Sequence, residues 1–388
     1  MLPRDIFSEE HDIYRDSVAR LIRDEFVPYH DKWEEENMVP HEAWLKAGEA
    51  GMLCCTVPED YGGPGGDFLH STVVTEELFR HSISGPAFMI HSDMVTPYLL
   101  DYGTEEQKRK WLPEMVTGRM RAAIGFSEPS AGSDLAAIRT TAVRDGDNYV
   151  LNGQKTFITG GYAAELLLVA CKTDPSAGAK GISLIMVEAD RPGYARGKKL
   201  NKIGLKAQDT AEIFMQDVCV PASNLIGVEN RGFYQMMKEL AQERLVQAVR
   251  AQIIVETAIL WTIEYTVNRP IFGRTVADFQ NTRFKLAEMH AQASVMRAYV
   301  DRCISAHAAG KLDATEAAIV KMTSVELQGK VLDECLQLHG GWGYIWDYPI
   351  ARAYADARIA RIAGGTVEVM KQIISNAILP SERRGRVD

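Results

Sequence analysis

The chain has 388 residues, 46% of them hydrophobic and 24% charged, which is the composition of a globular protein long enough for two or three packed units. Its formal net charge of −9 gives no general attraction to nucleic acid or to an anionic membrane, and no uninterrupted apolar run approaches membrane-spanning length. We therefore expect neither as a partner. The first residues, MLPRDIFSEEHD, lack a secretory signal pattern, so we expect a cytoplasmic location.

Neither the six cysteines nor the nine histidines form a ligand pattern. No two cysteines have CxxC spacing, and the histidines show no HxxxH or HExxH arrangement. We expect reduced, buried thiols and no metal site. The cysteines are Cys54, Cys55, Cys171, Cys219, Cys303 and Cys335.

The sequence predicts three domains in the order helical, β and helical. Residues 1–120 are mainly helical: Thr104 and Gln107 have the spacing of a capping box, and the stretch from Val57 to Asp67 is too rich in Gly and Pro for a helix. Residues 121–227 contain short Val-, Ile- and Leu-rich runs with an Asp145-Gly146 turn signal, typical of strands.

Residues 228–388 return to long helical patterns with few prolines. One predicted helix has Phe284, Met289, Met296 and Val300 roughly on one face, which indicates a buried stripe. The predicted fold class is α+β: an N-terminal helical domain, a central β-barrel or sheet, and a C-terminal four-helix bundle.

The stretch from Phe126 to Asp134, FSEPSAGSD, is the strongest candidate for a binding site. It combines small and hydroxylated residues, which allow backbone N–H groups and hydroxyls to approach a flat, phosphate-bearing ligand. The same residue types also form ordinary turns. By itself, the stretch favours a cofactor site without establishing one.

Four further segments go beyond what packing requires. Each alone has an ordinary explanation as a strand end, a linker or a helix cap. Their joint occurrence in this order is hard to obtain by chance. They are KTFITGG (155–161), NRPIFGRTVADFQ (268–280), QLHGGWGY (337–344) and AGGTVEV (363–369).

With these five segments the chain resembles the acyl-CoA dehydrogenases, a flavoenzyme family with the same α–β–α order, and most resembles their long-chain type. The resemblance extends over essentially the whole chain. It implies FAD as cofactor and oxidation of a fatty acyl-CoA to the trans-2-enoyl-CoA. It also implies an electron-transferring flavoprotein as electron acceptor and an obligate homo-oligomer, a tetramer, because FAD sites in the family cross subunits.

The resemblance implies three groups of FAD-binding residues. The Phe126–Asp134 loop and the 155–161 segment match the segments on the two faces of the flavin. The family often has Trp where this chain has Phe157. A second group matches positions that reach the ADP half of an FAD bound by a neighbouring subunit, and a third matches the last FAD-binding turn. They are Phe126, Ser127, Gly132, Ser133, Phe157, Ile158 and Thr159; Arg269, Phe272, Gln280, Gln337 and Gly341; Thr366 and Glu368.

The reaction class requires a base for the α-proton of the thioester. Many family members carry a carboxylate just before the Gly-Thr of the last segment, where this chain has Gly364. The long-chain and isovaleryl types place their base in the helix that opens the C-terminal bundle, and Glu243 matches that register. We predict that Glu243 is the catalytic base. The alternative is an exposed helix glutamate, although Leu240 and Leu245 beside it favour partial burial.

Further residues match positions that contact the substrate. Ser133 lies beside the thioester by resemblance, and Arg244 near the CoA moiety. We expect the backbone N–H of Gly364 to bind the thioester oxygen and Gly365 to bind substrate as well. Tyr234 contacts the ester by resemblance, and we expect it on the same side of its helix as Glu243, nine residues later.

Two other functions fit parts of the pattern. One is a flavin-dependent oxidase on the same fold, which would produce peroxide. The other is a non-catalytic scaffold without flavin, which would be colourless. The length and branching of the acyl chain cannot be read from the sequence.

Overall fold

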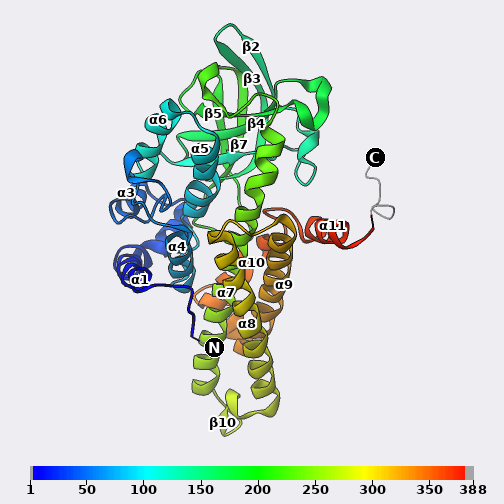
Figure 1. The fold of residues 1–388 in the computed structure, drawn as a ribbon. Coiled ribbons are helices and arrows are strands. Elements are labelled where there is room, and N and C mark those ends of the chain that lie inside the picture. The colour runs from blue at the N-terminus through cyan, green and yellow to red at the C-terminus, as the bar shows by residue number, and fades with distance from the viewer. Residues whose placement is uncertain (1–2, 381–388) are drawn as a thin grey trace. The chain divides into compact units, whose positions relative to one another are not determined.

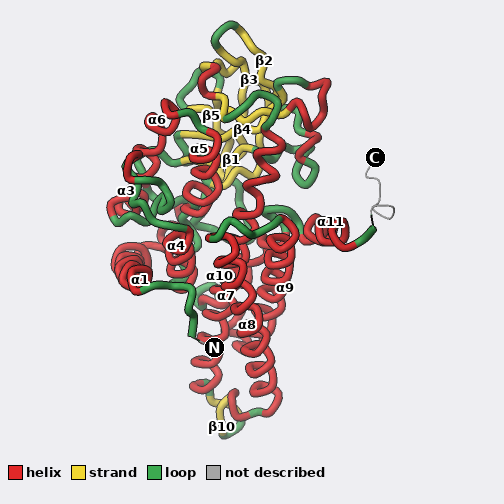
Figure 2. Tube along the Cα trace, viewed as in Figure 1, coloured by secondary structure: helices red, strands yellow, loops and turns green. Residues whose placement is uncertain are grey.

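The computed structural model describes residues 3–380, which divide into two compact units. The helical unit takes Met1–Asp16, Thr75–Ser82 and Ala241–Asp388, and the sheet unit takes Ser17–Val74 and Ile83–Leu240. Three helices contribute residues to both units: α1 (Glu9–Leu21), α4 (Phe68–Arg80) and α7 (Gly232–Asn268). Figure 1 labels the elements, and Figure 2 separates helices from strands by colour.

The sheet unit is built on an eight-stranded sheet with the order β6-β7-β3-β2-β4-β5-β8, and β1 pairs with β4 in parallel. The described strands thus form an open path, and the sheet alternative of the sequence prediction is confirmed. The strands are β1 (Ala122–Gly125), β2 (Thr141–Asp145), β3 (Asn148–Thr159), β4 (Leu166–Lys172), β5 (Ile182–Glu188), β6 (Tyr194–Lys199), β7 (Thr210–Pro221) and β8 (Leu225–Ile226).

Central strands β4 and β5 are buried along nearly their whole length, as expected for continuous apolar runs covered on both faces. β3 and β7 pair antiparallel over twelve-residue strands, and their register shifts between Lys155 and Ile158. Such a bulge re-aims the side chains beside it. The bulge therefore acts on Phe157, one of the residues expected to face a cofactor.

Short helices complete the sheet unit. The capping box of Thr104 and Gln107 is present at the start of α6, and β2 and β3 meet at the Asp145-Gly146 turn with Gly146 at φ 55°. Both local predictions are confirmed. The helices are α2 (His30–Glu36), α3 (His41–Glu49), α5 (Thr96–Tyr102) and α6 (Glu105–Val116), with π-helical turns at Ile22–Phe26 and Ile90–Val95.

The helical unit contains most of α7 and the helices α8 to α11, of which α8 and α9 are long (Figure 2). Helix α9 packs against α8, α10 and α11. On α8, Met289 and Val300 are buried as predicted, but Phe284 is 64% exposed and lies outside the core. The elements are α8 (Gln280–Ala308), α9 (Ala314–His339), α10 (Pro349–Ala357), α11 (Val367–Ile378) and the hairpin β9 (Pro270–Ile271) with β10 (Arg274–Thr275).

Among the described residues, only α7 is long and apolar enough to cross a membrane by length and composition. Its apolar window is 78% buried inside the protein. The core helix of a soluble protein meets the same criteria, so α7 is weak evidence for a membrane span.

A buried ion network joins the three sequence segments of the helical unit. Arg4 from the N-terminal segment bonds Glu76 on α4 at 2.8 Å and Asp301 on α8 at 2.7 Å. Arg297 on α8 lies 3.0 Å from Glu76, whose side chain is fully buried. Charges buried this deeply need several partners, and each one here has them.

Candidate active site

The Phe126–Asp134 loop is fastened by backbone hydrogen bonds. Glu128 and Ala131 bond each other through both backbone N–H groups, at 2.8 and 3.1 Å, and the N–H of Thr156 on β3 donates to the carbonyl of Ser127 at 3.0 Å. Gly132 and Ser133 are exposed, and a Cβ added at Gly132 would meet nothing within 4 Å. Open space beside a small residue on a rigid loop is what a closely approaching ligand requires.

A buried ion pair links this loop to β3. The ammonium of Lys155 donates to Glu128 at 2.7 Å and to the carbonyl of Ala170 at 2.7 Å, and Glu128 also accepts from the N–H groups of Arg139 and Thr140. Burial lowers the pKa of Lys155, and the Glu128 carboxylate opposes that shift. Lys155 Nζ also lies 3.5 Å from the carbonyl of Phe126 in the loop, so the pair ties the position of the loop to β3.

Phe157, expected to contact the flavin, is an exposed aromatic residue on β3. Its ring is 70% exposed, and its backbone has φ 58°, a value that aromatic residues rarely adopt. The next residue, Ile158, is buried and Thr159 is half-buried. Strain at a non-glycine residue persists where the surroundings enforce it, commonly at a binding site. An exposed aromatic face held this way suits stacking against a flat ring, so these residues fit FAD.

In the helical unit, Glu243 is 7% exposed and Arg244 is 5% exposed, both on α7. The alternative that Glu243 is an exposed helix glutamate is therefore wrong. Burial lowers the pKa of Arg244, and the negative charge of Glu243 opposes the shift. The Nε of Arg244 has no hydrogen-bond partner among the described residues. A buried N–H without a partner carries a desolvation cost that a bound acceptor would remove.

Gly364 lies near α7 within the same unit. A Cβ placed on it would lie 3.5 Å from Cγ of Gln247, one turn after Glu243. Its φ of 64° and that of Gly365, 84°, are left-handed, which favours glycine at both positions. A glutamate at 364 would be strained in this conformation.

The two glycines lead into the N-terminus of α11. Thr366 caps this helix by accepting from the N–H of Val369 at 3.3 Å. Lys321 on α9 is fully buried and donates to the carbonyl of Gly365 at 2.6 Å. Glu368 is exposed in the first turn, and hydrogen bonds from its own N–H and from Thr366 lower its pKa. The turn thus offers backbone N–H groups at a helix N-terminus, a site suited to an anion.

Three residues expected at the ADP half of FAD line one pocket of the helical unit. Arg269, Gln337 and Gly341 surround a pocket of about 590 Å³ together with Tyr265 and Trp342. Phe272 and Gln280 do not line it: Phe272 is 88% exposed at the tip of the β9–β10 hairpin, and Gln280 is exposed at the start of α8. The pocket offers a guanidinium, a carboxamide and aromatic faces, which suit a nucleotide.

The expectation for Tyr234 is wrong in its geometry. Nine residues are about two and a half turns of a helix, so Tyr234 and Glu243 leave α7 on opposite sides. Tyr234 is 53% exposed, in contrast to the buried Glu243. Contact of Tyr234 with a bound ester therefore requires the ester to reach a different side of α7.

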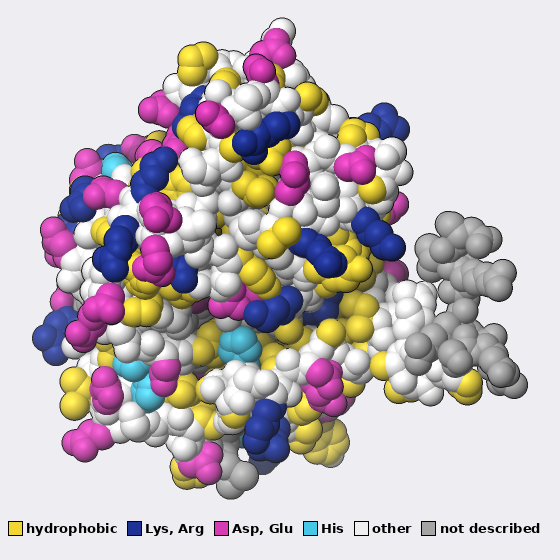
Figure 3. Space-filling model, turned by 45° about the horizontal axis from the view of Figure 1, so that its top comes forward, with side chains coloured by type: hydrophobic (Ala, Val, Ile, Leu, Met, Phe, Trp, Pro, Cys, Tyr) yellow, Lys and Arg dark blue, Asp and Glu magenta, His cyan; other side chains and the backbone are white. Residues whose placement is uncertain are grey.

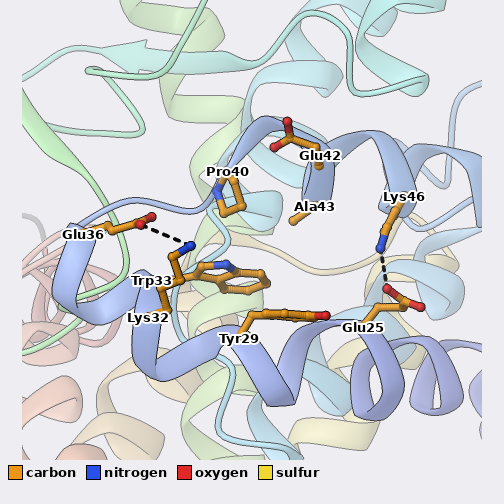
Figure 4. Close-up of a pocket in the computed structure, with 9 residues that line it drawn as sticks. All are labelled: Glu25, Tyr29, Lys32, Trp33, Glu36, Pro40, Glu42, Ala43 and Lys46. Carbon is orange, nitrogen blue, oxygen red and sulfur yellow. Dashed lines mark hydrogen bonds and ion pairs between the residues drawn. The ribbon is translucent and has the colours of Figure 1, made fainter.

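A further pocket, of about 290 Å³, lies in the sheet unit and contains none of the predicted site residues. Figure 4 shows Trp33 and Tyr29 along it, with ion pairs between Lys32 and Glu36 and between Lys46 and Glu25. These charges are already paired. The surface in Figure 3 likewise shows acidic and basic side chains interspersed.

Sequence reasoning missed four buried charged residues near the predicted site segments. Lys155 and Glu128 stand within two of the candidate segments, and the available signal was that Lys155 is the only charged residue of β3. Lys321 and Arg250 stand in long helical patterns, where a single charge has no distinctive spacing. Their burial is a property of the packed structure.

Family models cover nearly all of the chain. Residues 8–119 match the acyl-CoA dehydrogenase N-terminal domain, 123–218 the middle domain and 230–379 the C-terminal domain. The chain is 47% identical over 378 residues to the mitochondrial long-chain specific acyl-CoA dehydrogenase of Rattus norvegicus, covering 97% of this chain and 88% of that protein.

Solved structures agree with this similarity. An acyl-CoA dehydrogenase from Geobacillus kaustophilus is 48% identical with a TM-score of 0.94, covering 97% of this chain and 99% of that one. A glutaryl-CoA dehydrogenase from Mycobacterium smegmatis in complex with FADH2 is 25% identical with a TM-score of 0.90, covering 98% and 97%.

Fold and site together define a flavoprotein oxidoreductase that uses FAD. The chain belongs to the acyl-CoA dehydrogenase family. Its activity is the dehydrogenation of acyl-CoA thioesters.

Proposed function

We propose that this protein oxidises a fatty acyl-CoA to the trans-2-enoyl-CoA with Glu243 as the base. The observation that carries the proposal is the burial of Glu243, which is 7% exposed. Glu243 lies one turn before Gln247 on α7, and Gln247 is next to Gly364 in space. A carboxylate at this place can take the α-proton, while the left-handed glycine at 364 leaves the room that a second carboxylate would occupy. The 47% identical relative named as long-chain specific supports a fatty acyl chain.

The chain's own residues then have distinct roles. Glu243 takes the proton from the α-carbon as the β-carbon loses a hydride. Backbone N–H groups at Gly364 and Gly365 stabilise negative charge on the thioester oxygen. Arg244 binds the CoA moiety, and Ser133 lies beside the thioester.

When bound, FAD supplies the acceptor for the hydride. Phe126, Ser127, Gly132 and Ser133 on the loop hold one face of its ring, and Phe157, Ile158 and Thr159 hold the other. Thr366 and Glu368 contact it at the turn before α11. Arg269, Gln337 and Gly341, with Phe272 and Gln280 at the rim, receive the ADP half from a second copy of the chain. This arrangement requires a homo-oligomer, and we propose a tetramer.

Domain limits, electron acceptor and location complete the proposal. We propose domains 1–120, 121–227 and 228–388, which the ranges of the three family models support. The acceptor is an electron-transferring flavoprotein. A 34% identical structure, associated with the electron transferring flavoprotein of Acidaminococcus fermentans, supports this choice. The location is the cytoplasm, supported by six cysteines that are all free thiols.

The test is anaerobic reduction of the purified yellow protein by acyl-CoAs. Added substrate should bleach the flavin absorbance, and an electron-transferring flavoprotein should then restore it faster than oxygen does. Rapid reoxidation by oxygen with release of peroxide would instead establish the oxidase. A colourless protein that gains no activity with added FAD would refute the proposal.

A further inference from the structure

Arg250 is a buried arginine on α7 with hydrogen-bonding capacity that the protein leaves unused. It is 5% exposed, and its Nε and Nη2 have no hydrogen-bond partner among the described residues. Its guanidinium carbon lies 4.7 Å from the centre of the Phe79 ring. Burial lowers the pKa of Arg250 to about 10, although the Asp356 carboxylate acts in the opposite direction. The group is therefore charged at neutral pH.

Arg250 lies on the same face of α7 as the proposed base. Glu243, Gln247 and Arg250 are spaced four and three residues apart, which aligns them along one side of a helix. The seven residues from Glu243 to Arg250 span about 10 Å of helix axis. If the α-carbon of an acyl chain lies at Glu243 and the chain follows this face of α7, the far end of the chain reaches the guanidinium of Arg250.

The energetics favour an oxygen-bearing end over a methyl end. A buried cation with two unpaired N–H groups is costly, and an apolar chain end would leave that cost in place. A carboxylate would accept from both N–H groups in the forked geometry that arginine offers, and would add charge attraction. The guanidinium packs on the Phe79 ring, and the Nε and Nη2 groups that would make this contact have no other partner among the described residues.

We propose that Arg250 binds a carboxylate at the far end of the acyl chain, so that the preferred substrates are CoA monothioesters of medium-length dicarboxylic acids. This inference rests on the proposed function, because Glu243 places the thioester end. The competing role for Arg250 is purely structural, as a partner of Asp356. That role affects stability and flavin content, and it does not discriminate between chain ends.

The experiment compares kcat/KM for adipyl-, suberyl- and sebacyl-CoA with kcat/KM for hexanoyl-, octanoyl- and decanoyl-CoA of matched length, using the FAD-loaded enzyme. The best carboxylated ester should exceed its unsubstituted counterpart by roughly tenfold or more, the scale of a hydrogen-bonded charge pair. Arg250→Leu should reverse the preference, Arg250→Lys should restore part of it, and Arg302→Leu, which removes an exposed arginine, should leave it unchanged.

A second readout does not depend on turnover. In Glu243→Gln enzyme, calorimetric titration should show suberyl-CoA binding roughly tenfold tighter than octanoyl-CoA, and Arg250→Leu in that background should abolish the difference. Wild-type enzyme that oxidises octanoyl-CoA at least as well as suberyl-CoA, with a ratio that Arg250→Leu does not move, overturns the inference and leaves the proposed function intact. If no acyl-CoA of either series reduces the flavin, the proposed function itself fails.

Discussion

The ammonium of Lys155 lies 2.7 Å from a carboxylate oxygen of Glu128, and the two side chains are 0% and 4% exposed. Glu128 belongs to the Phe126–Asp134 loop, and Lys155 stands two residues before Phe157 on β3. The pair therefore fastens together the two segments proposed for the opposite faces of the flavin. Loss of this ion pair should therefore both destabilise the sheet unit and disorder the proposed cofactor site.

Replacement of Lys155 by Met should destabilise the enzyme by about 3–5 kcal/mol, because Glu128 would keep a buried charge without its cation. The measurement is the urea midpoint followed by flavin release at fixed protein and FAD concentrations. Lys110→Met is the matched control: Lys110 bonds Glu188 at the same 2.7 Å, but its side chain is 52% exposed, so about 0–1 kcal/mol is expected. Equal losses in the two variants would contradict this account.

The Glu76 network predicts acid sensitivity of the helical unit. Burial alone would raise the pKa of Glu76, but the guanidinium groups of Arg297, Arg4 and Arg15 hold it at about 2. Because the folded pKa is below the unfolded one, this stabilisation is present above about pH 4.5 and is lost as the pH falls towards 2. The free energy of unfolding should drop by about 3 kcal/mol over that range.

Glu76→Gln should be less stable near neutral pH. Its free energy of unfolding should also fall less steeply than that of the wild type as the pH is lowered from about 4.5 to 2. Glu105→Gln, which changes an exposed carboxylate bonded to Tyr61, should keep the wild-type limb. An unchanged slope in Glu76→Gln would show that other groups govern acid unfolding.

The lowered pKa of Lys321 predicts that the free energy of unfolding rises at alkaline pH. Burial lowers the pKa of Lys321 to about 8, Arg244 acts in the same direction, and Glu368 opposes them. Between this value and the ordinary lysine pKa the unfolded chain binds more protons than the folded one, so the free energy of unfolding should increase as the pH rises from about 8 to 10. Lys321→Met should lose this increase.

The matched control is Lys330→Met on the same helix, α9, where the lysine side chain is 54% exposed and pairs with Glu288. Its stability should still rise from pH 8 to 10 as the wild type does. If the free energy of unfolding of Lys321→Met still rises between about pH 8 and 10, another group causes the rise.

The sequence predicted the features that depend on near neighbours. The Thr104–Gln107 capping box and the Asp145-Gly146 turn each involve residues at most three positions apart, and each is confirmed. The three-part α–β–α order also follows from local composition. Strands β1 (Ala122–Gly125) and β6 (Tyr194–Lys199) were not predicted, because one is very short and the other, YARGKK, has no apolar alternation.

The remaining features depend on contacts distant in sequence. Lys155 and Glu128 are 27 positions apart, and nothing local to either residue indicates that they meet. Phe284 carried an apolar signal on α8 and is nevertheless exposed, because helical periodicity does not define how far the buried stripe extends. The burial of Glu243 was favoured by Leu245 beside it, but only the packed helix established it.

The central claim is that Glu243 takes the α-proton, and the rate of anaerobic flavin reduction by saturating acyl-CoA tests it most directly. Glu243→Gln should retain FAD and bind substrate, and its reduction rate should fall by about a thousandfold, the scale of losing a general base. Glu239→Gln changes a buried carboxylate one turn earlier on α7, hydrogen-bonded to Tyr102, and should reduce the flavin within about tenfold of the wild-type rate. Near-normal flavin reduction in a folded, FAD-loaded Glu243→Gln enzyme would contradict the account.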